Sequence, residues 1–216
     1  MIRFEDVTAK RSDTKGIYNV SFHVKKGQFV YLMGPTGAGK STIIKVIQKS
    51  INIESGSVYI NGNNILDLKQ NSLAYYRRDI GMIFQDFKLL NDRSVFENIA
   101  IPLQIIGCDQ KIIENKISTI LSKVGLLDKK YVYPKELSGG EQQKVCVARA
   151  IIKSPKIILA DEPTGNLDPS ASDDIINLLE DEAKKGTTII MATHNYPLIE
   201  DRIKHFIEIN NGRLIK

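Results

Sequence analysis

The segment GPTGAGKS, residues 34–41, restricts the possible fold of this chain more than any other feature of its sequence. It fits the pattern G-x-x-x-x-G-K-[ST], and it stands between the apolar run QFVYLM and an amphipathic stretch. Glycines here let main-chain N–H groups converge on phosphate oxygens, and the N-terminus of a following helix adds partial positive charge. The pattern predicts a strand, a helix and, between them, a phosphate loop made by Gly34, Pro35, Thr36, Gly37, Ala38, Gly39, Lys40, Ser41 and Thr42.

Two residues of this loop and two from a later strand form the expected catalytic set. Lys40 is expected to reach the β- and γ-phosphates of ATP, and Ser41 to bind Mg²⁺. The apolar run in IILADE, residues 157–162, predicts a strand from whose end Asp161 holds the metal, directly or through water. Glu162 would lie within reach of the attacking water as general base, a role worth about 10²–10⁴ in rate. Such a run often only ends a strand, so this interpretation depends on the phosphate loop.

A third segment, LSGGEQ at residues 137–142, predicts a second helix terminus that binds an anion. Ser138 is expected to cap a helix that starts near Glu141, and the two glycines leave main-chain N–H groups exposed. On its own, a Ser-Gly-Gly turn is more often just a cap. One nucleotide needs only one phosphate loop, however, so a second anion-binding cradle suggests that ATP is shared.

Hydrophobic periodicity predicts an α/β fold with an inserted helical block. The alternating N-terminal segments predict antiparallel strands, and Asn61-Gly62 and Asn211-Gly212 predict hairpin turns. The apolar runs at 157–159 and 187–193 predict central strands of a parallel sheet. Helical spacing appears at Ile113, Ile117, Ile120 and Val124. We expect a single domain with a core of about residues 1–85 and 156–216, and a helical subdomain of about residues 86–155.

Composition narrows the cellular setting without deciding the function. The N-terminus MIRFEDV has no apolar signal core, and two Cys without metal or disulfide spacing predict a reduced cytoplasmic setting. The longest apolar tract, residues 99–108, is too short to span a bilayer, so any membrane role must come through a partner. The net charge of +5 is spread over scattered basic pairs. This spread fits a surface near an anionic membrane or a nucleotide, but a pattern of this kind more often marks only a solvated surface.

In their order, GPTGAGKS, Gln85, LSGGEQ, ILADEP, GNLD at 165–168 and His194 resemble the ATP-binding cassette (ABC) ATPases across the whole chain. The resemblance implies a P-loop fold with a RecA-like core sheet, and Mg-dependent hydrolysis of ATP to ADP and phosphate. It implies that Gln85 senses Mg²⁺ and the attacking water, and that His194 contacts the γ-phosphate; outside this family His194 would be a structural histidine. It also implies an ATP-dependent, head-to-tail homodimer in which one copy closes over the nucleotide of the other through Ser138, Gly139, Gly140, Glu141 and Asp168.

One departure from the family concerns the adenine base. The family usually has an aromatic residue near the end of the first strand, and this chain has Arg11 or a neighbour there. A guanidinium can stack on a base through a cation–π contact, worth about 0.5–2 kcal/mol. Tyr18 is the nearest aromatic residue, but its position is typical of a core residue. The sequence thus predicts phosphate binding and leaves the selectivity for adenine open.

The segment GMIFQDFKLLNDRSVFENIAIPL, residues 81–103, closely resembles the FtsE-type cell-division ATPases, the partners of the membrane protein FtsX, although Asn91 replaces a common Pro. Ser94 and Glu97 form a capping box, so a helix should start at Val95. The resemblance implies that residues 87–96 receive a short helix of an FtsX-like protein at the cytoplasmic side of the inner membrane, at the division septum. Four apolar side chains lie in this segment: Phe87, Leu89, Leu90 and Phe96. About half of them are expected in the core and half in contact with this partner.

Other functions are open on the sequence alone. The chain also resembles the ATPases of lipoprotein-releasing and macrolide-exporter systems, whose segments after the glutamine differ more. A soluble ABC protein acting on nucleic acid is a further alternative, but such proteins usually carry two cassettes, a coiled coil or a long basic insertion. No nucleic acid is therefore expected as partner. A third alternative is a catalytically silent binding scaffold, and the presence of Lys40 and Glu162 argues against it.

Overall fold

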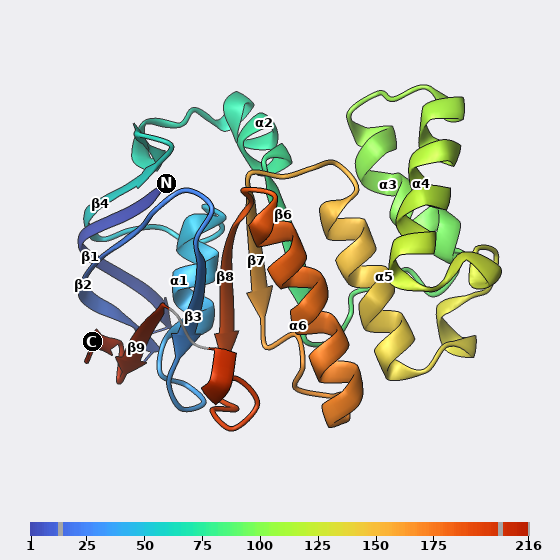
Figure 1. Cartoon of the computed structure of the whole chain (residues 1–216). Coiled ribbons are helices and arrows are strands. Elements are labelled where there is room, and N and C mark those ends of the chain that lie inside the picture. Colours follow the sequence, from blue (N-terminus) through green and yellow to red (C-terminus); the bar gives the residue numbers. More distant parts are fainter. Residues whose placement is uncertain (13–14, 203–204, 216) are drawn as a thin grey trace.

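The computed structural model describes residues 1–12, 15–202 and 205–215 and consists of two β-sheets and several helices (Figure 1). Within these residues the larger sheet has six strands in the order β10-β9-β3-β8-β7-β6, and the smaller has four in the order β2-β1-β4-β5. The strands are β1 Ile2–Ser12, β2 Lys15–Val24, β3 Phe29–Met33, β4 Ser55–Ile60, β5 Asn63–Asn64, β6 Ile80–Phe84, β7 Ile157–Asp161, β8 Thr188–Thr193, β9 Phe206–Asn210 and β10 Arg213–Leu214. The helices are α1 Lys40–Ile47, α2 Leu73–Arg78, α3 Val95–Ile105, α4 Gln110–Val124, α5 Gly139–Ile151 and α6 Pro169–Lys184, with short 3₁₀ turns between them.

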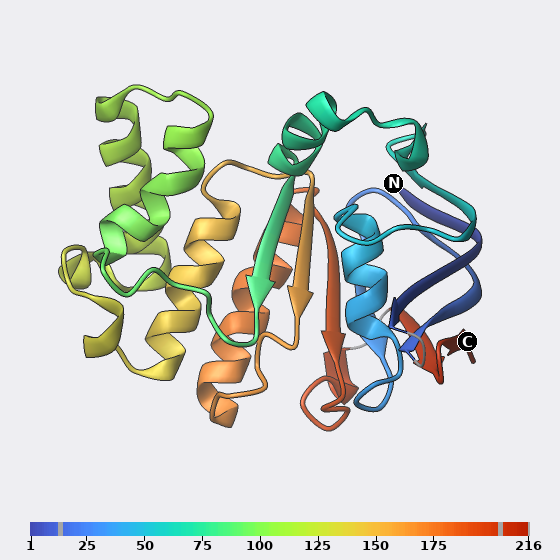
Figure 2. The same ribbon diagram turned by 180° about the vertical axis from the view of Figure 1, so that it is seen from behind.

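The larger sheet is parallel except at β10, and helices cover both of its faces. Strands β3, β8, β7 and β6 pair in parallel, as the sequence predicted for β7 and β8. Side chains alternate along each strand because successive residues point to opposite faces. On β7, Leu159 belongs to the core that α1 completes, while Ile158 packs with the apolar face of α6. Figures 1 and 2 show these two helices on opposite sides of the sheet.

The smaller, antiparallel sheet lies beside α1 and closes the core on that side. Its inward side chains, among them Ile2, Phe4 and Val58, join those of α1 in one apolar cluster. The Asn61-Gly62 turn joins β4 to β5, and both of its residues have the positive φ that such a two-residue turn requires, 52° and 82°. Asn211-Gly212 joins β9 to β10 with φ of 48° and 75°. Both predicted hairpins are confirmed.

The helices α3, α4 and α5 pack together beside β6, at the far end of the molecule from the small sheet (Figures 1 and 2). The predicted capping box at Ser94 and Glu97 is present, and α3 begins at Val95 as expected. A second capping box, Ser138 with Glu141, starts α5 at Gly139. The prediction of a start near Glu141 was wrong by two residues, because Ser138 caps the main-chain N–H three positions on and the glycines between form the first helical turn. In the part of the chain that the structure describes, no helix combines the length and the apolar character needed to cross a bilayer.

Candidate active site

Four parallel strands end at one edge of the large sheet, and a predicted site residue follows each of them. Gly34 follows β3, Gln85 follows β6, Glu162 follows β7 and His194 follows β8. The register places the strand ends level, since Phe84 pairs with Asp161, Asp161 with Ala192, and Met33 with Thr193. Ligands of open α/β sheets bind outside the carboxyl ends of the strands. Here a cavity of about 360 Å³ opens at that edge, and Lys40, Ser41, Gln85, Glu162 and His194 line it.

The phosphate loop is held in shape by its own lysine. Gly34 has φ +145°, and a Cβ at this position would lie 2.1 Å from the carbonyl oxygen of Ile209, so only glycine fits. Lys40 begins α1 and is buried; its Nζ donates to the carbonyl oxygens of Gly34 at 2.7 Å and Pro35 at 3.1 Å. Thr36, Gly37, Gly39 and Thr42 also line the cavity, whereas Gly34, Pro35 and Ala38 are not among the described residues that line it.

Glu162 is held in a strained conformation between two nitrogen groups. Its φ is +50°, a left-handed value that costs a non-glycine residue about 1–3 kcal/mol and that is common at functional sites. One carboxylate oxygen lies 3.1 Å from Lys40 Nζ. The other accepts from the main-chain N–H of His194 at 3.3 Å and lies 2.9 Å from His194 Nδ1. Because its neighbours fix the carboxylate at the cavity wall, Glu162 has the placement that a general base needs.

The predicted metal ligands are adjacent and suit Mg²⁺. Ser41 Oγ donates to Asp161 Oδ1 at 3.0 Å, and Gln85 lines the same cavity. Burial raises the pKa of the Asp161 carboxyl, and the hydrogen bond from Ser41 opposes this rise. Hydroxyl, amide and carboxylate oxygens are the donors that Mg²⁺ prefers, and it needs only one or two carboxylates from the protein when phosphate oxygens complete its shell. The donor set therefore fits this ion.

The side of the cavity expected to receive the base is basic. Arg11 lines it, as predicted, together with Lys15 and Gly16, which the sequence analysis missed. Strands β1 and β2 pair here, with Lys10 opposite Gly16, and this pairing brings Arg11 and Lys15 to the same part of the cavity. The available signal was a pair of basic residues, Arg11 and Lys15, on either side of the three polar residues 12–14. Tyr18 does not line the cavity; a Cβ added to Gly212 would lie 2.7 Å from its ring.

The structure does not bring the LSGGEQ segment to the phosphate loop of the same chain. None of Ser138, Gly139, Gly140 and Glu141 is among the described residues that line the cavity. Ser138 and Glu141 bond each other's main-chain N–H groups, and Lys129 pairs with the Glu141 carboxylate. Asp168 caps α6 by accepting from the N–H of Ala171 at 2.9 Å. The N-terminus of α5 is thus built and charge-balanced at a distance from the cavity.

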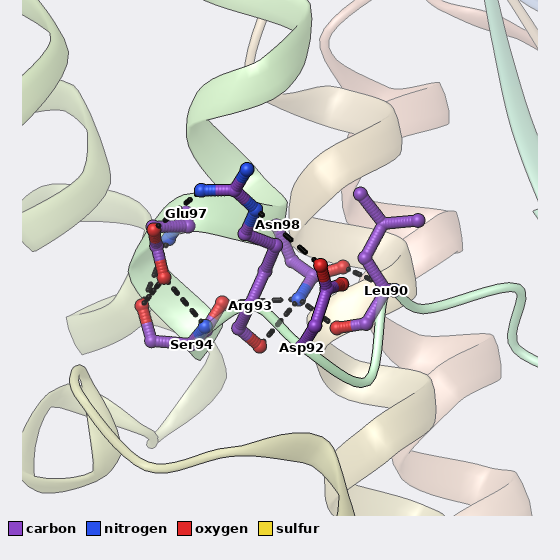
Figure 3. Close-up of polar contacts among 6 residues, drawn as sticks. All are labelled: Leu90, Asp92, Arg93, Ser94, Glu97 and Asn98. Carbon is purple, nitrogen blue, oxygen red and sulfur yellow. Dashed lines mark hydrogen bonds and ion pairs between the residues drawn. The ribbon is translucent and has the colours of Figure 1, made fainter.

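Hydrogen bonds from Asn98 to its main chain fix the loop from β6 to α3, and one apolar side chain of this loop is exposed. Asn98 on α3 is fully buried; it accepts from the N–H of Leu90 at 2.8 Å and donates to the carbonyl oxygens of Leu90, Arg93 and Ser94 at 3.0 Å (Figure 3). The Leu90 side chain points away from this network and is 46% exposed. Leu89 and Phe96 pack against the helical core, and Phe87 is half-buried.

Comparisons with known proteins agree with this geometry. The ABC transporter family model matches residues 17–165, which include the phosphate loop, Gln85, the LSGGEQ segment and Glu162. The chain belongs to the ABC transporter family. It is 43% identical over 217 residues to the cell division ATP-binding protein FtsE of Streptococcus pneumoniae serotype 2, covering 100% of this chain and 94% of that protein. It is 44% identical over 215 residues to FtsE of Escherichia coli K12, covering 99% and 97% of the two chains.

A solved ABC cassette has the same fold. It is a dimeric ATP-binding cassette in a post-hydrolysis state with ADP and Pi bound; the TM-score is 0.88 at 32% identity, and the match covers 100% of this chain and 97% of that one. The predicted ABC fold and ATPase class are therefore confirmed, and within the family the chain is of the FtsE type.

Proposed function

We propose that the chain is the ATP-binding and hydrolysing subunit of an FtsEX-like complex that acts in bacterial cell division, in septal-ring assembly or in the control of peptidoglycan hydrolysis. The observation that carries this proposal is the convergence of Lys40, Ser41, Glu162 and His194 on one cavity in a chain that matches FtsE proteins end to end. The core of about residues 1–85 and 156–216 would bind ATP. The helical block of about residues 86–155 would move when ATP binds and would transmit this movement to a partner.

Each cavity residue has a role in this function. Lys40 and the loop from Gly34 to Thr42 would bind the phosphates, and Ser41, Gln85 and Asp161 would hold Mg²⁺. The ion, when bound, supplies charge that stabilises the phosphoryl oxygens in the transition state. Glu162 takes the proton of the attacking water, and His194, whose ring nitrogen lies 2.9 Å from that carboxylate, orients it and contacts the γ-phosphate.

A second copy of the chain would complete the site. Main-chain N–H groups in the first turn of a helix lack an intrahelical partner and can bind anions, and in α5 this turn begins with Gly139 and Gly140, which do not line the cavity of their own chain. The solved relative is a dimer. We infer an ATP-dependent head-to-tail homodimer in which Ser138, Gly139, Gly140, Glu141 and Asp168 of one copy face the nucleotide of the other.

A groove beside the Gln85 loop suits the cytoplasmic segment of an FtsX-like membrane protein. A cavity of about 310 Å³ lies between β6, α3 and α5, and its lining combines apolar with basic side chains: Ile80, Met82, Phe84, Pro102, Lys88, Arg149 and Lys153. Such a groove favours a short helix that presents apolar and acidic side chains. Leu90 is exposed two residues after Lys88, which lines this cavity. Docking of the partner at the cavity and Leu90 would hold the chain at the inner face of the membrane, at the septum.

Replacing the phosphate-loop lysine tests the nucleotide assignment and the role in division together. Lys40→Ala removes an ammonium ion that would bond phosphate oxygens, so we expect ATP affinity to fall at least about tenfold, because hydrogen bonds to charged groups are worth about 1.5–3 kcal/mol. Depletion of the natural chain should give filamentous cells that Lys40→Ala does not rescue. Lys45→Ala, on the same helix and outside the cavity, is the control. Normal septation after depletion would refute the division role.

Arg11 can be tested as the platform for the base. Base stacking on an aromatic ring is worth about 1–3 kcal/mol, more than most cation–π contacts, so Arg11→Tyr should tighten ATP binding by about fivefold in calorimetry. Arg11→Leu, which lacks both a charge and a ring, should weaken binding. Equal affinities for all three proteins would place the base elsewhere in the cavity, beside Lys15 or Gly16.

A further inference from the structure

Gln143 is a buried amide on α5 that links two of the proposed catalytic segments. It is fully buried, and its Nε2 donates to the carbonyl oxygen of Pro163 at 2.7 Å and to that of Phe84 at 3.3 Å. Pro163 follows Glu162 directly, and Phe84 precedes Gln85. A single nitrogen atom therefore sets the separation between the main chains that carry the proposed base and the proposed sensor of Mg²⁺ and water.

The same side of α5 holds the loop that continues from Gln85. Phe87 and Lys88 both have left-handed backbones, with φ of 58° and 51°, which non-glycine residues keep only when their surroundings impose it. Arg149 donates to the carbonyl oxygens of both residues, at 2.9 and 2.7 Å, and the Cys146 thiol lies 3.0 Å from that of Phe87. Burial raises the pKa of Cys146 to about 12, so the thiol keeps the proton that it donates.

The Gln143 amide is also incompletely paired. Its Oε1 is buried and has no hydrogen-bond partner among the described residues. Buried amides that serve packing alone normally have both ends satisfied, because an unpaired polar atom costs stability. Here both observed bonds use the donor end, and a leucine of similar size would fill the space without the unpaired oxygen. What a glutamine adds at this position is the pair of donated hydrogen bonds.

We propose that Gln143 is a positioning residue for ATP hydrolysis, which fixes Gln85 and Glu162 relative to each other and ties both to the helix that begins at Gly139. Gln143 lies four residues from that helix start, about 6 Å along the axis at 1.5 Å per residue. A displacement of the α5 N-terminus on contact with the partner copy's nucleotide would therefore reach both residues through one side chain. This inference rests on the proposed roles of Gln85 and Glu162.

The decisive measurement separates kcat from ATP affinity. In Gln143→Leu we expect kcat of the purified chain to fall about 10- to 100-fold, since a misplacement of about 1 Å can cost that much. The Kd for ATP should stay within about threefold, because Lys40 and its loop are held by β3 and α1 and not by Gln143. Thr188→Val is the control: it removes a fully buried hydroxyl that accepts from the main-chain N–H of Gly27 at 3.0 Å, at the start of β8 and away from the cavity. It should lower Tm and leave kcat within about twofold.

Gln143→Glu gives a readout that a merely structural role would not move. An ionised carboxylate cannot donate to Pro163 or Phe84, but a protonated one can, and burial favours the protonated form. Relative to the natural chain, kcat of this variant should rise as pH falls, and this holds as a test even if Gln143→Leu does not fold. A pH-independent ratio, or a Gln143→Leu kcat that falls only as far as that of Thr188→Val, overturns the inference. If Glu162→Gln hydrolyses ATP normally, the proposed base itself is wrong, which is a different result.

Discussion

Glu162→Gln will bind ATP and hydrolyse it about 10²- to 10⁴-fold more slowly than the natural chain. The amide keeps the shape of the side chain but cannot take a proton from water. The Lys40 ammonium, 3.1 Å from the carboxylate, keeps its bonds to the two loop carbonyls, so the phosphate site survives the change. Single-turnover hydrolysis and calorimetric binding, measured on the same preparation, separate the two effects.

The same variant should accumulate as a dimer at saturating Mg-ATP, because closure no longer ends in hydrolysis. Light scattering with and without nucleotide measures this. Glu114→Gln makes the same chemical change on the surface of α4 and should turn over ATP at the natural rate. A Glu162→Gln protein that binds ATP and remains a monomer would refute the shared-nucleotide dimer.

Leu90→Asp should release the chain from membranes while nucleotide binding is retained. A buried anchor residue in an interface commonly contributes 2 kcal/mol or more, which is about thirtyfold in affinity. Asn98 holds the main chain at Leu90, whereas the side chain is solvent-exposed, so the change should leave the loop in place. Phe87 is a poorer choice, because its ring lies 3.8 Å from the position of a Cβ on Gly139 and its carbonyl is bonded to Arg149.

Leu127→Asp is the control for this experiment, since Leu127 is 48% exposed and Leu90 is 46% exposed. Membrane sedimentation, recovery of the bound integral protein from detergent extracts, and cell length are measured for both variants. Normal sedimentation of a folded Leu90→Asp protein would refute the docking surface. Detachment with normal division and failed lipoprotein release would instead favour the function of the lipoprotein-releasing relatives.

Several elements of this fold could be predicted from the sequence because they depend on local chemistry. Asn-Gly turns, the Ser94 capping box and the glycines of the phosphate loop each require a particular backbone, and the structure has it at each of them. The bonds of Gln143 join residues 59 and 20 positions apart, and nothing in the residues around Gln143 distinguishes it from Gln142. Likewise, Lys15 and Gly16 reach the cavity through pairing with β1. Such long-range contacts depend on topology, which periodicity does not specify.

The level strand ends at the catalytic edge also determine where this chain tolerates a change of length. Neighbouring residues of a strand point to opposite faces, so shifting β7 by one residue against β6 and β8 would move Asp161 into the position of Glu162, or Glu162 into that of Asp161. One inserted or deleted residue within β7 would thus abolish ATP hydrolysis even in a chain that still folds. The connection between α3 and α4, residues 106–109, carries none of the cavity residues. We therefore expect natural variation in length in connections of that kind, and an engineered peptide tag inserted there should leave the cavity intact.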